Sequence, residues 1–401
     1  MAVRSSQLRL LTSLDSGAPS LTYAAGGMIT LLDAVLVNGY GSVTLTSLVV
    51  ASNIATATVS GGHNLSMYGS GDAAVGPVIR IEGATPAGLN GDWRLSSVPD
   101  GTTFTFEVSG IPDQTATGTI TAKRAPLGFT KPYSGTNLAA YRQGGGNQFY
   151  LRVDDTATYD AKVRGYEAMT GISTGAGEFP TTAMRSNGYY ITKRATTGNS
   201  PWFIIGTDRL FYIGIAAHSS YGFYEISVFG DVPPLSAGDG YATFLGASTN
   251  TYSSYGYSNH PWYRYSATQY LCVARPPSGV GTAQEINTTS FSLSCAGSFS
   301  GSTGSADYPN PTDNSLILSG PTYAYVYGTT GYLRAEFPGA VWVNNYVERY
   351  EIGDDSTFVF YKTPSGVGYA ADKYLMGFHI LTSNSATPGF GFVDLLTDWH
   401  I

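Results

Sequence analysis

Three apolar runs separated by tight turns occupy residues 201–231, and they constrain the fold more than any other part of the chain. The first two, 202–205 and 210–217, are rich in β-branched and aromatic residues and flank a Gly-Thr-Asp turn, which predicts a β-hairpin. Apolar and polar residues alternate over 224–229, as in a strand that is buried on one face. Because a three-stranded meander cannot bury its apolar faces alone, this stretch predicts a larger β domain around it.

The composition also favours a β protein. Charged residues make up 12% of the 401-residue chain, and 50 residues are glycine. In average domains the charged share is about 25% and the glycine share about 7%. The sequence holds 30 tyrosines and no long stretch of helix-forming residues. We therefore predict an all-β, multi-domain protein of antiparallel β-sandwich or barrel-like domains, with one short N-terminal helix over residues 28–37.

Changes in sequence texture divide the chain into four parts. Residues 1–41 form an N-terminal arm and the short helix. Short strands at even spacing predict a small inserted β module over 42–126. Residues 127–247, together with 28–41, form a central β-sandwich domain, and 248–401 form a C-terminal β domain with a Tyr-rich loop.

The predicted module contains the clearest turn signal in the chain. Asn90-Gly91 stands just ahead of Trp93, and this dipeptide is typical of a two-residue hairpin turn. The strands predicted for the module are 47–50, 54–59, 78–82, 92–98, 103–108 and 116–121.

The charge pattern argues against nucleic acid as a partner, and the lack of long apolar segments argues against a membrane. The formal net charge is -7, and Lys and Arg residues are not clustered, so we expect no nucleic acid as a partner. Residues 1–27 lack the continuous apolar region of a signal peptide, and the longest helical apolar segment is too short to span a bilayer. We therefore expect that the protein is made in a cytoplasm and does not insert into a membrane.

The cysteines and histidines predict no metal or cofactor. Cys272 and Cys295 lie in apolar surroundings, and two cysteines in a chain of this length make no disulfide framework, so buried free thiols are favoured over a single bridge. No two histidines have metal-ligand spacing. His218 is interpreted as a polar turn residue, and His63 is expected to form a local hydrogen bond. The five histidines are His63, His218, His260, His379 and His400.

Three patterns have the form of catalytic or calcium sites, and each has a simpler explanation. Residues 171–175 fit G-x-S-x-G, but no helix follows, as a nucleophile elbow requires. The pairs Asp154-Asp155 and Asp354-Asp355 could serve a glycosidase only with partner carboxylates about 5–10 Å away, and solvated turn carboxylates are favoured. The spacing of acidic residues over 307–313 fits no EF-hand loop. We therefore predict no catalytic residues.

A loop rich in aromatic residues is the candidate binding surface. Tyrosine combined with Ser, Gly and Asn is typical of adaptable binding loops, because rigid rings supply contact area at a low entropic cost. The alternative is a loop that packs its rings on its own domain. The candidate residues are Tyr252, Tyr255, Tyr257, Trp262, Tyr263 and Tyr265.

Several strings along the chain resemble virion proteins of tailed bacteriophages and prophages, of the kind found near the tail tip. Part of the module resembles a small β module that recurs in such proteins, through His63, IEGA at 81–84, LNGDW at 89–93 and TFTF at 103–106. The strings in the rest of the chain are LLDA at 31–34, VNGYG at 37–41, FTKPYSGTNLAAYR at 129–142, YLRVDD at 150–155, RGYEAM at 164–169, YPNPTD at 308–313 and LRAEFPG at 333–339.

This resemblance implies a structural role within an assembled virion. Our leading expectation is a non-enzymatic component of the virion tail, at the tail tip or baseplate, assembled in the cytoplasm of a bacterial host. The expected partners are further copies of the chain, in a trimer, other tail or baseplate proteins, and a receptor or glycan of the host surface. A carbohydrate-binding adhesin of the tail-fibre or spike type is the alternative function, and a polysaccharide depolymerase is the third.

Overall fold

The computed structural model of the chain describes residues 8–194, 197–217, 224–235, 242–249, 272–278, 281–289, 318–326, 333–343, 358–365, 371–380, 389–396 and 399. Within these ranges most regular structure is antiparallel β-sheet, which confirms the predicted all-β class. The predicted short helix is present as α1 (Gly27–Leu32), which continues into a π-helical turn (Asp33–Asn38).

Three sheets make up most of the structure. The largest, which we call the body sheet, has the spatial order β1 (Arg9–Thr12), β19 (Trp202–Gly206), β20 (Leu210–Ile215), β21 (Glu225–Val232), β22 (Ala242–Gly246), β23 (Cys272–Arg275), β24 (Gln284–Thr289), β25 (Leu318–Val326), β26 (Leu333–Val343), β29 (Gly389–Asp394), β28 (Tyr374–Ile380) and β27 (Val359–Lys362). The second, the flanking sheet, has the order β11 (Thr130–Gly135), β12 (Leu138–Arg142), β13 (Tyr150–Asp154), β14 (Asp160–Tyr166) and β17 (Tyr189–Thr192).

The third sheet belongs to the predicted module, which we call the insert. Its order is β3 (Tyr40–Thr44), β10 (Thr121–Arg124), β6 (Val78–Glu82), β7 (Gly91–Ser97), β8 (Thr103–Glu107), β5 (Ile54–Thr58), β4 (Ser47–Ala51) and β9 (Gln114–Thr115). Two short two-stranded sheets complete the described strands: the hairpin of β15 (Ala168–Gly171) and β16 (Thr174–Ala176), and the pair of β2 (Leu21–Thr22) with the distant β18 (Asn199–Ser200).

The predicted meander is confirmed as β19, β20 and β21, but its burial was predicted wrongly. The strand β21 is buried over almost its whole length rather than on one face. One face of the meander, with Ile204 and Phe211, packs against α1 and the flanking sheet, and the other, with Phe203 and Tyr212, belongs to a second core. Strands covered on both sides are continuously apolar, which explains the sequence of this stretch.

The second core forms because the body sheet curls until its two halves face each other. Phe203 of β19 lies 4.9 Å from Phe378 of β28, measured between ring centroids. Beside it, the backbone N–H of Tyr224 donates to the carbonyl of His379 at 3.0 Å. The sheet also runs across the predicted boundary at 247/248, because β22 pairs directly with β23.

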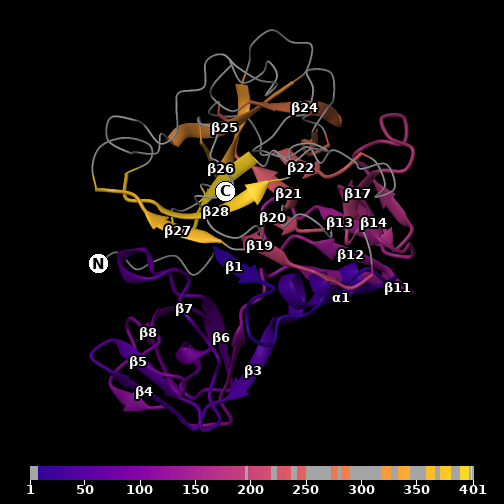
Figure 1. Cartoon of the computed structure of the whole chain (residues 1–401). Helices are drawn as coiled ribbons and strands as arrows, with labels where there is room; N and C mark the ends of the chain where they lie inside the picture. The colour runs from indigo at the N-terminus through magenta and orange to yellow at the C-terminus, as the bar shows by residue number, and fades with distance from the viewer. Residues whose placement is uncertain are drawn as a thin grey trace.

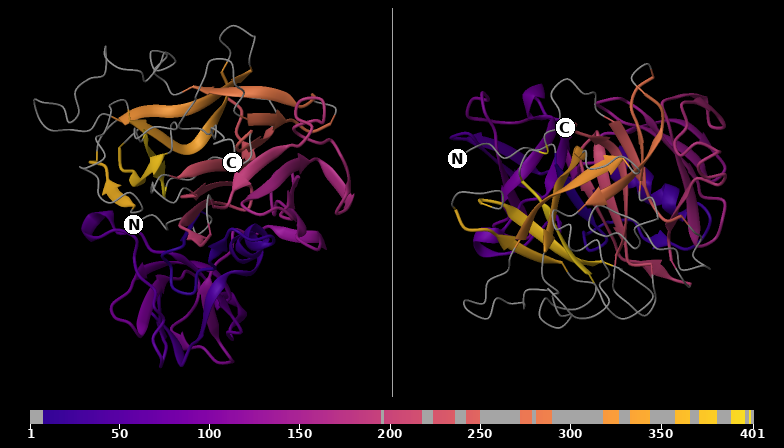
Figure 2. Two further views of the ribbon diagram at one scale, coloured as in Figure 1. Left: turned by 45° about the vertical axis from the view of Figure 1, so that its right-hand side comes forward. Right: turned by 90° about the horizontal axis from the view of Figure 1, so that it is seen from above.

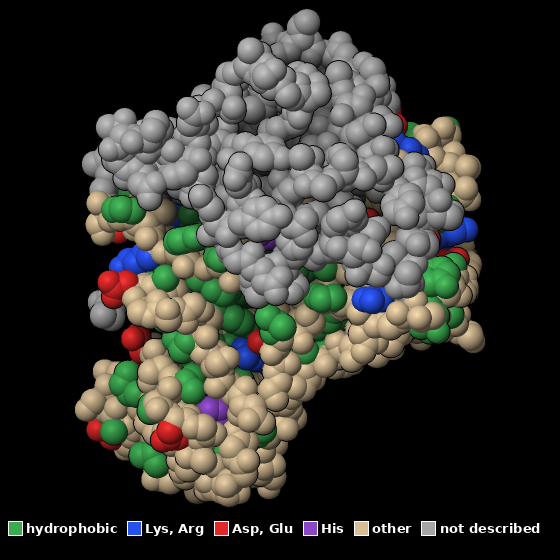
Figure 3. Space-filling view, in the orientation of Figure 1, with side chains coloured by type: hydrophobic (Ala, Val, Ile, Leu, Met, Phe, Trp, Pro, Cys, Tyr) green, Lys and Arg blue, Asp and Glu red, His purple; other side chains and the backbone are tan. Residues whose placement is uncertain are grey.

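The insert forms a separate lobe below the other two sheets (Figures 1, 2 and 3). It has its own core, which includes Leu48, Ile79, Phe104 and Phe106. The predicted strand at 116–121 is not present; β9 ends before it and β10 begins at its last residue.

The predicted two-residue turn at Asn90-Gly91 is also wrong. A longer loop joins β6 to β7, and Asn90 follows a 3₁₀ turn (Ala87–Leu89) within it. The side-chain amide of Asn90 bonds both the N–H and the carbonyl of Ala84, each at 2.8 Å. Asparagine therefore stabilises this loop through its side chain, and not through the left-handed backbone of a tight turn.

Candidate functional site

The insert meets the body sheet at the sheet's two edge strands, β1 and β27. Tyr68 of the insert contacts both edges, because its hydroxyl donates to the Leu10 carbonyl of β1 at 2.9 Å and its ring stacks on Phe360 of β27 at 6.1 Å. The guanidinium of Arg94 donates to the carbonyl of Leu8, next to β1. Unpaired edge strands are open to pairing with other chains, and these side chains of the insert cover the carbonyls concerned.

Both ends of a short segment of the insert, residues 68–75, enter the core of the body sheet, while Ser70, Gly71 and Asp72 between them are exposed. Tyr68 and Val75 bond each other through both backbone N–H groups at 2.8 Å, and both side chains are buried in the second core. Gly69 lies next to Phe360, where a Cβ atom would stand 2.8 Å from the Cβ of Phe360, and its φ is +71°. Only glycine fits this position without a shift of the neighbouring strand.

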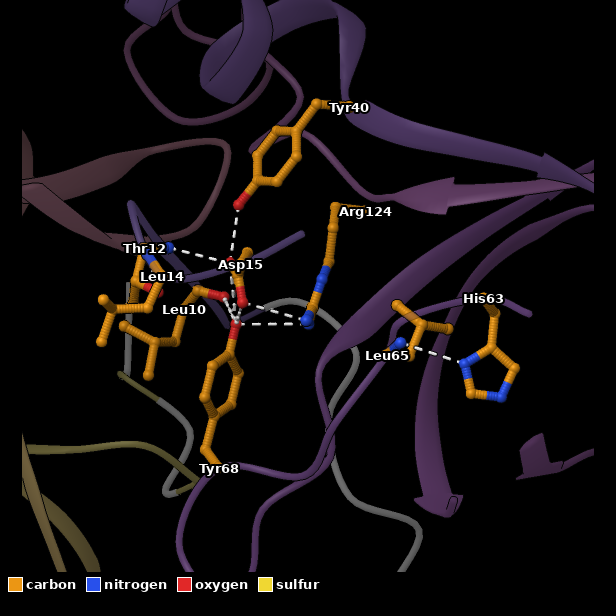
Figure 4. A network of polar contacts seen from close by, with 9 residues as sticks. All are labelled: Leu10, Thr12, Leu14, Asp15, Tyr40, His63, Leu65, Tyr68 and Arg124. Atoms are coloured by element: carbon orange, nitrogen blue, oxygen red, sulfur yellow. Dashed lines mark hydrogen bonds and ion pairs between the residues drawn. The ribbon is translucent and has the colours of Figure 1, made fainter. Parts of the chain in front are cut away.

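A buried polar network lies beside this segment (Figure 4). The carboxylate of Asp15 accepts hydrogen bonds from the Tyr40 hydroxyl at 2.7 Å and the Thr12 N–H at 2.9 Å. The Tyr68 hydroxyl oxygen lies 3.1 Å from it, so the single hydroxyl proton is shared between Asp15 and the Leu10 carbonyl, and Arg124 Nη2 lies 2.9 Å from the same carboxylate. Tyr40 begins β3 and Arg124 ends β10, so the network fixes the two strands that connect the insert to the body.

The pKa shifts of Tyr40, Tyr68 and Arg124 are in the direction that these contacts require. Burial raises the pKa of Tyr40 and of Tyr68, and the Asp15 carboxylate raises both further, so the two hydroxyls remain donors. Burial opposes the charge of Arg124, but the neighbouring Asp15 acts in the opposite direction, and the pKa of the guanidinium is raised overall. Arg124 therefore keeps its positive charge beside Asp15, and the neighbouring hydroxyls donate to the Asp15 side chain.

A second ion-pair cluster joins the insert to β1. The carboxylate of Asp92 lies 2.6 Å from Arg80 Nε of the insert and 2.5 Å from Arg9 Nη2 of β1. Arg9 also donates to the Leu127 carbonyl at 3.1 Å, where the chain leaves the insert. Burial works against the charge of Asp92, but the two guanidinium groups lower the pKa of its carboxyl, which stays ionised.

The candidate binding loop lies outside the described residues, so its six aromatic residues remain a prediction. The same holds for Asp354, Asp355, the segment 307–313, Cys295, His218, His260 and His400. Cys272 is a buried free thiol, as expected. His63 is confirmed as a locally bonded residue, because its Nδ1 accepts from the Leu65 N–H at 3.0 Å.

The solvated interpretation of Asp154-Asp155 is wrong for Asp155. Its side chain is fully buried, and Lys193 Nζ lies 2.5 Å from its Oδ1. Asp154 accepts a local bond from the Thr156 hydroxyl at 2.6 Å, as turn carboxylates do. Residues 171–175 lie in the β15–β16 hairpin and not between a strand and a helix, which excludes a nucleophile elbow there.

The described residues contain no group of three or more His, Cys, Asp or Glu side chains that could hold a metal ion. Over the same ranges, no helix is both long and apolar enough to cross a bilayer. Comparison of the sequence with family models and with curated proteins gave no match.

Sequence reasoning missed the junction residues Asp15, Tyr68 and Arg124. Their signals are weak, because each is a single polar residue in a strand or loop, and its partners lie 25 to 109 positions away in sequence. The Gly39-Tyr40-Gly41 triplet was the strongest clue, since two glycines beside one ring predict close approach of another segment.

Proposed function

We propose that this chain is a structural component of a bacteriophage virion, located at the tail tip or baseplate, where it forms homo-oligomers and contributes to host attachment. The observation that carries the proposal is the insert, a lobe with its own core that projects from the body and is fixed at a buried polar junction. A lobe held in this way suits the presentation of a binding surface. The sequence resemblance to tail proteins supports the same role.

The use of buried charge also favours a structural role over a catalytic one. Asp15, Asp92 and Asp155 each face a cation, and each holds together segments distant in sequence. Asp231 lies 2.6 Å from the Thr243 hydroxyl and 2.8 Å from the Asn147 N–H, which joins the flanking sheet to the body sheet. These carboxylates bond their own fold, so the proposed mechanism is assembly and adhesion through buried area.

Purified particles test the proposal. Mass spectrometry of phage particles from an induced host should detect the chain in a fixed ratio to a known tail protein, and Fab fragments against the insert should label the tail tip in electron micrographs. The matched control is a Fab against the host's most abundant cytoplasmic protein. Absence of the chain from particles that still adsorb to cells would overturn the proposal.

A carbohydrate-binding adhesin remains the second candidate, on the aromatic residues of the sequence alone. Alanine at Trp262 and Tyr263 should then abolish adsorption while the circular dichroism spectrum and the oligomeric state stay unchanged. Unchanged adsorption would remove this candidate.

A further inference from the structure

The insert connects to the body through a neck that resembles a hinge. The neck consists of the start of β3 and the end of β10, which pair with each other and carry a register shift between Ala122 and Arg124. On the β3 side, Gly39 and Gly41 have φ values of +75° and +66°. Two glycines with left-handed backbone, one on each side of a single residue, allow the chain direction to change at low steric cost.

Most contacts that hold the insert against the body are polar. They include the Asp15–Arg124 pair, the Arg9–Asp92 pair and the bond from Arg94 to the Leu8 carbonyl. Charged groups recover their hydration when they separate, so a junction of ion pairs opens at a smaller net cost than an apolar interface of the same area.

The apolar part of the junction is small by comparison. The insert supplies two residues, Tyr68 and Val75, to the second core, and Tyr40 at the neck adds its ring to the first core, whereas the insert's own core contains many more residues. The junction therefore has the properties of a unit that opens while both neighbouring cores stay folded.

We propose that the insert is a lobe that exchanges between a docked and an undocked position on the body. In the docked state, the two ends of the segment 68–75, Tyr68 and Val75, lie in the core of the body sheet, and Tyr68 contacts the edge strands β1 and β27. In the undocked state, the lobe turns about Gly39 and Gly41, this segment leaves the body core, and the carbonyls of Leu8 and Leu10 become free. This inference is independent of the proposed virion role, because it concerns the equilibrium of one chain.

Thiol labelling of the full-length chain tests this equilibrium. Val75→Cys places a thiol at a junction position that is 1% exposed, and the buried Cys272 of the body core serves as an internal reference. Ala57→Cys adds a thiol that reports on the core of the insert. Labelling followed by peptide mass spectrometry should modify the thiol at position 75 at least tenfold faster than the thiols at positions 57 and 272, with a weaker dependence on urea, because undocking exposes less surface than unfolding.

A substitution at a distance separates movement of the whole lobe from fraying of one loop. Asp92→Asn weakens the pair with Arg9, which lies in a different cluster from the Asp15 network that Tyr68 joins. It also weakens the pair with Arg80 within the insert, so the thiol at position 57 is followed in the same variant to report on the insert's own stability. If the lobe moves as a unit, D92N should speed labelling at position 75 about tenfold or more, the lower end of the effect expected for the loss of one hydrogen bond between charged groups, and should leave labelling at position 57 unchanged. The matched control D100N changes an exposed aspartate of the insert that bonds only locally, to Thr102.

Two outcomes would overturn the proposal. Labelling at position 75 with the same rate and urea dependence as Cys272 would mean that the junction opens only when the whole chain unfolds. Fast labelling at position 75 that D92N leaves unchanged would mean that only residues 68–75 fray.

Discussion

Lys193 Nζ lies 2.5 Å from Asp155 Oδ1, and neither side chain has any exposed surface. The second carboxylate oxygen of Asp155 accepts the N–H of Met28 at 2.7 Å, at the start of α1. Lys193 also donates to the carbonyls of Ala24 and Ala157, at 2.7 and 2.9 Å. One ion pair thus fixes α1 and the segment before it against the flanking sheet.

The first prediction concerns this pair. Lys193→Met should destabilise the protein by about 3–5 kcal/mol, because it leaves the carboxylate of Asp155 buried without a cation. Lys162→Met is the matched control, since Lys162 is exposed on the adjacent strand β14, and it should cost less than about 0.5 kcal/mol. Urea unfolding measures both. Equal losses in the two variants would contradict the assigned role of Lys193.

The second prediction compares two neighbouring cations of β10. Arg124 is paired with Asp15 at 2.9 Å in a buried setting, while Lys123 is paired with Glu82, whose side chain is 50% exposed, also at 2.9 Å. Arg124→Met should cost about 3 kcal/mol and Lys123→Met less than about 1 kcal/mol, because only the first leaves a buried charge without its partner. Thermal and urea unfolding should agree on this order, and the reverse order would exclude the proposed junction network.

The third prediction concerns a glycine of the loop between β12 and β13. A Cβ atom at Gly146 would stand 1.9 Å from Asp231 Oδ2, and the residue has a φ of +62°. Gly146→Ala should therefore destabilise the chain by about 2 kcal/mol or more, through both the clash and the backbone strain. Gly171→Ala is the control, since no atom lies within 4 Å of its Cβ position. A neutral Gly146→Ala would show that the loop and Asp231 move apart freely.

The positions of the strands could be predicted from the sequence better than which of their faces are buried. Strands such as β19 and β20 could be read directly, because continuous β-branched and aromatic runs between turns have few other structures. Their burial on both faces could not be predicted, since it depends on the curl of the body sheet. That curl brings Phe378 against Phe203, although the two are more than 170 residues apart in sequence. Local pattern carries no information on such distant partners.

The partners of the buried polar residues could not be predicted either, for the same reason. Asp155 looked like a turn carboxylate because its neighbour Asp154 is one, and the lysine that buries it comes 38 residues later. Tyr68 stands in a Gly- and Ser-rich stretch with no periodic pattern, so nothing nearby indicates that its ring fills a core and its hydroxyl bonds an edge strand. Residues that join sheets are set by topology, and a single sequence specifies topology only weakly.

The last prediction concerns Glu225, at the start of β21. Burial raises the pKa of its carboxyl from 4.5 to about 8; a hydrogen bond with Thr192 acts in the opposite direction, and the charge of Asp160 adds to the increase. The folded chain therefore keeps this proton over a pH range in which the unfolded chain has lost it. Since the folded state binds more protons, its stability should fall as pH rises from about 4.5 to about 8 and level off above that value.

Glu225→Gln should remove this part of the pH dependence and make the variant more stable than the wild type above pH 8, by up to about 3 kcal/mol. Urea midpoints measured from pH 5 to pH 9 on both proteins give the difference directly, so that other titrating groups cancel. Glu107→Gln, at an exposed position of β8, should leave the wild-type profile unchanged. Parallel profiles for the wild type and E225Q would show that Glu225 is ionised in the folded chain throughout this range.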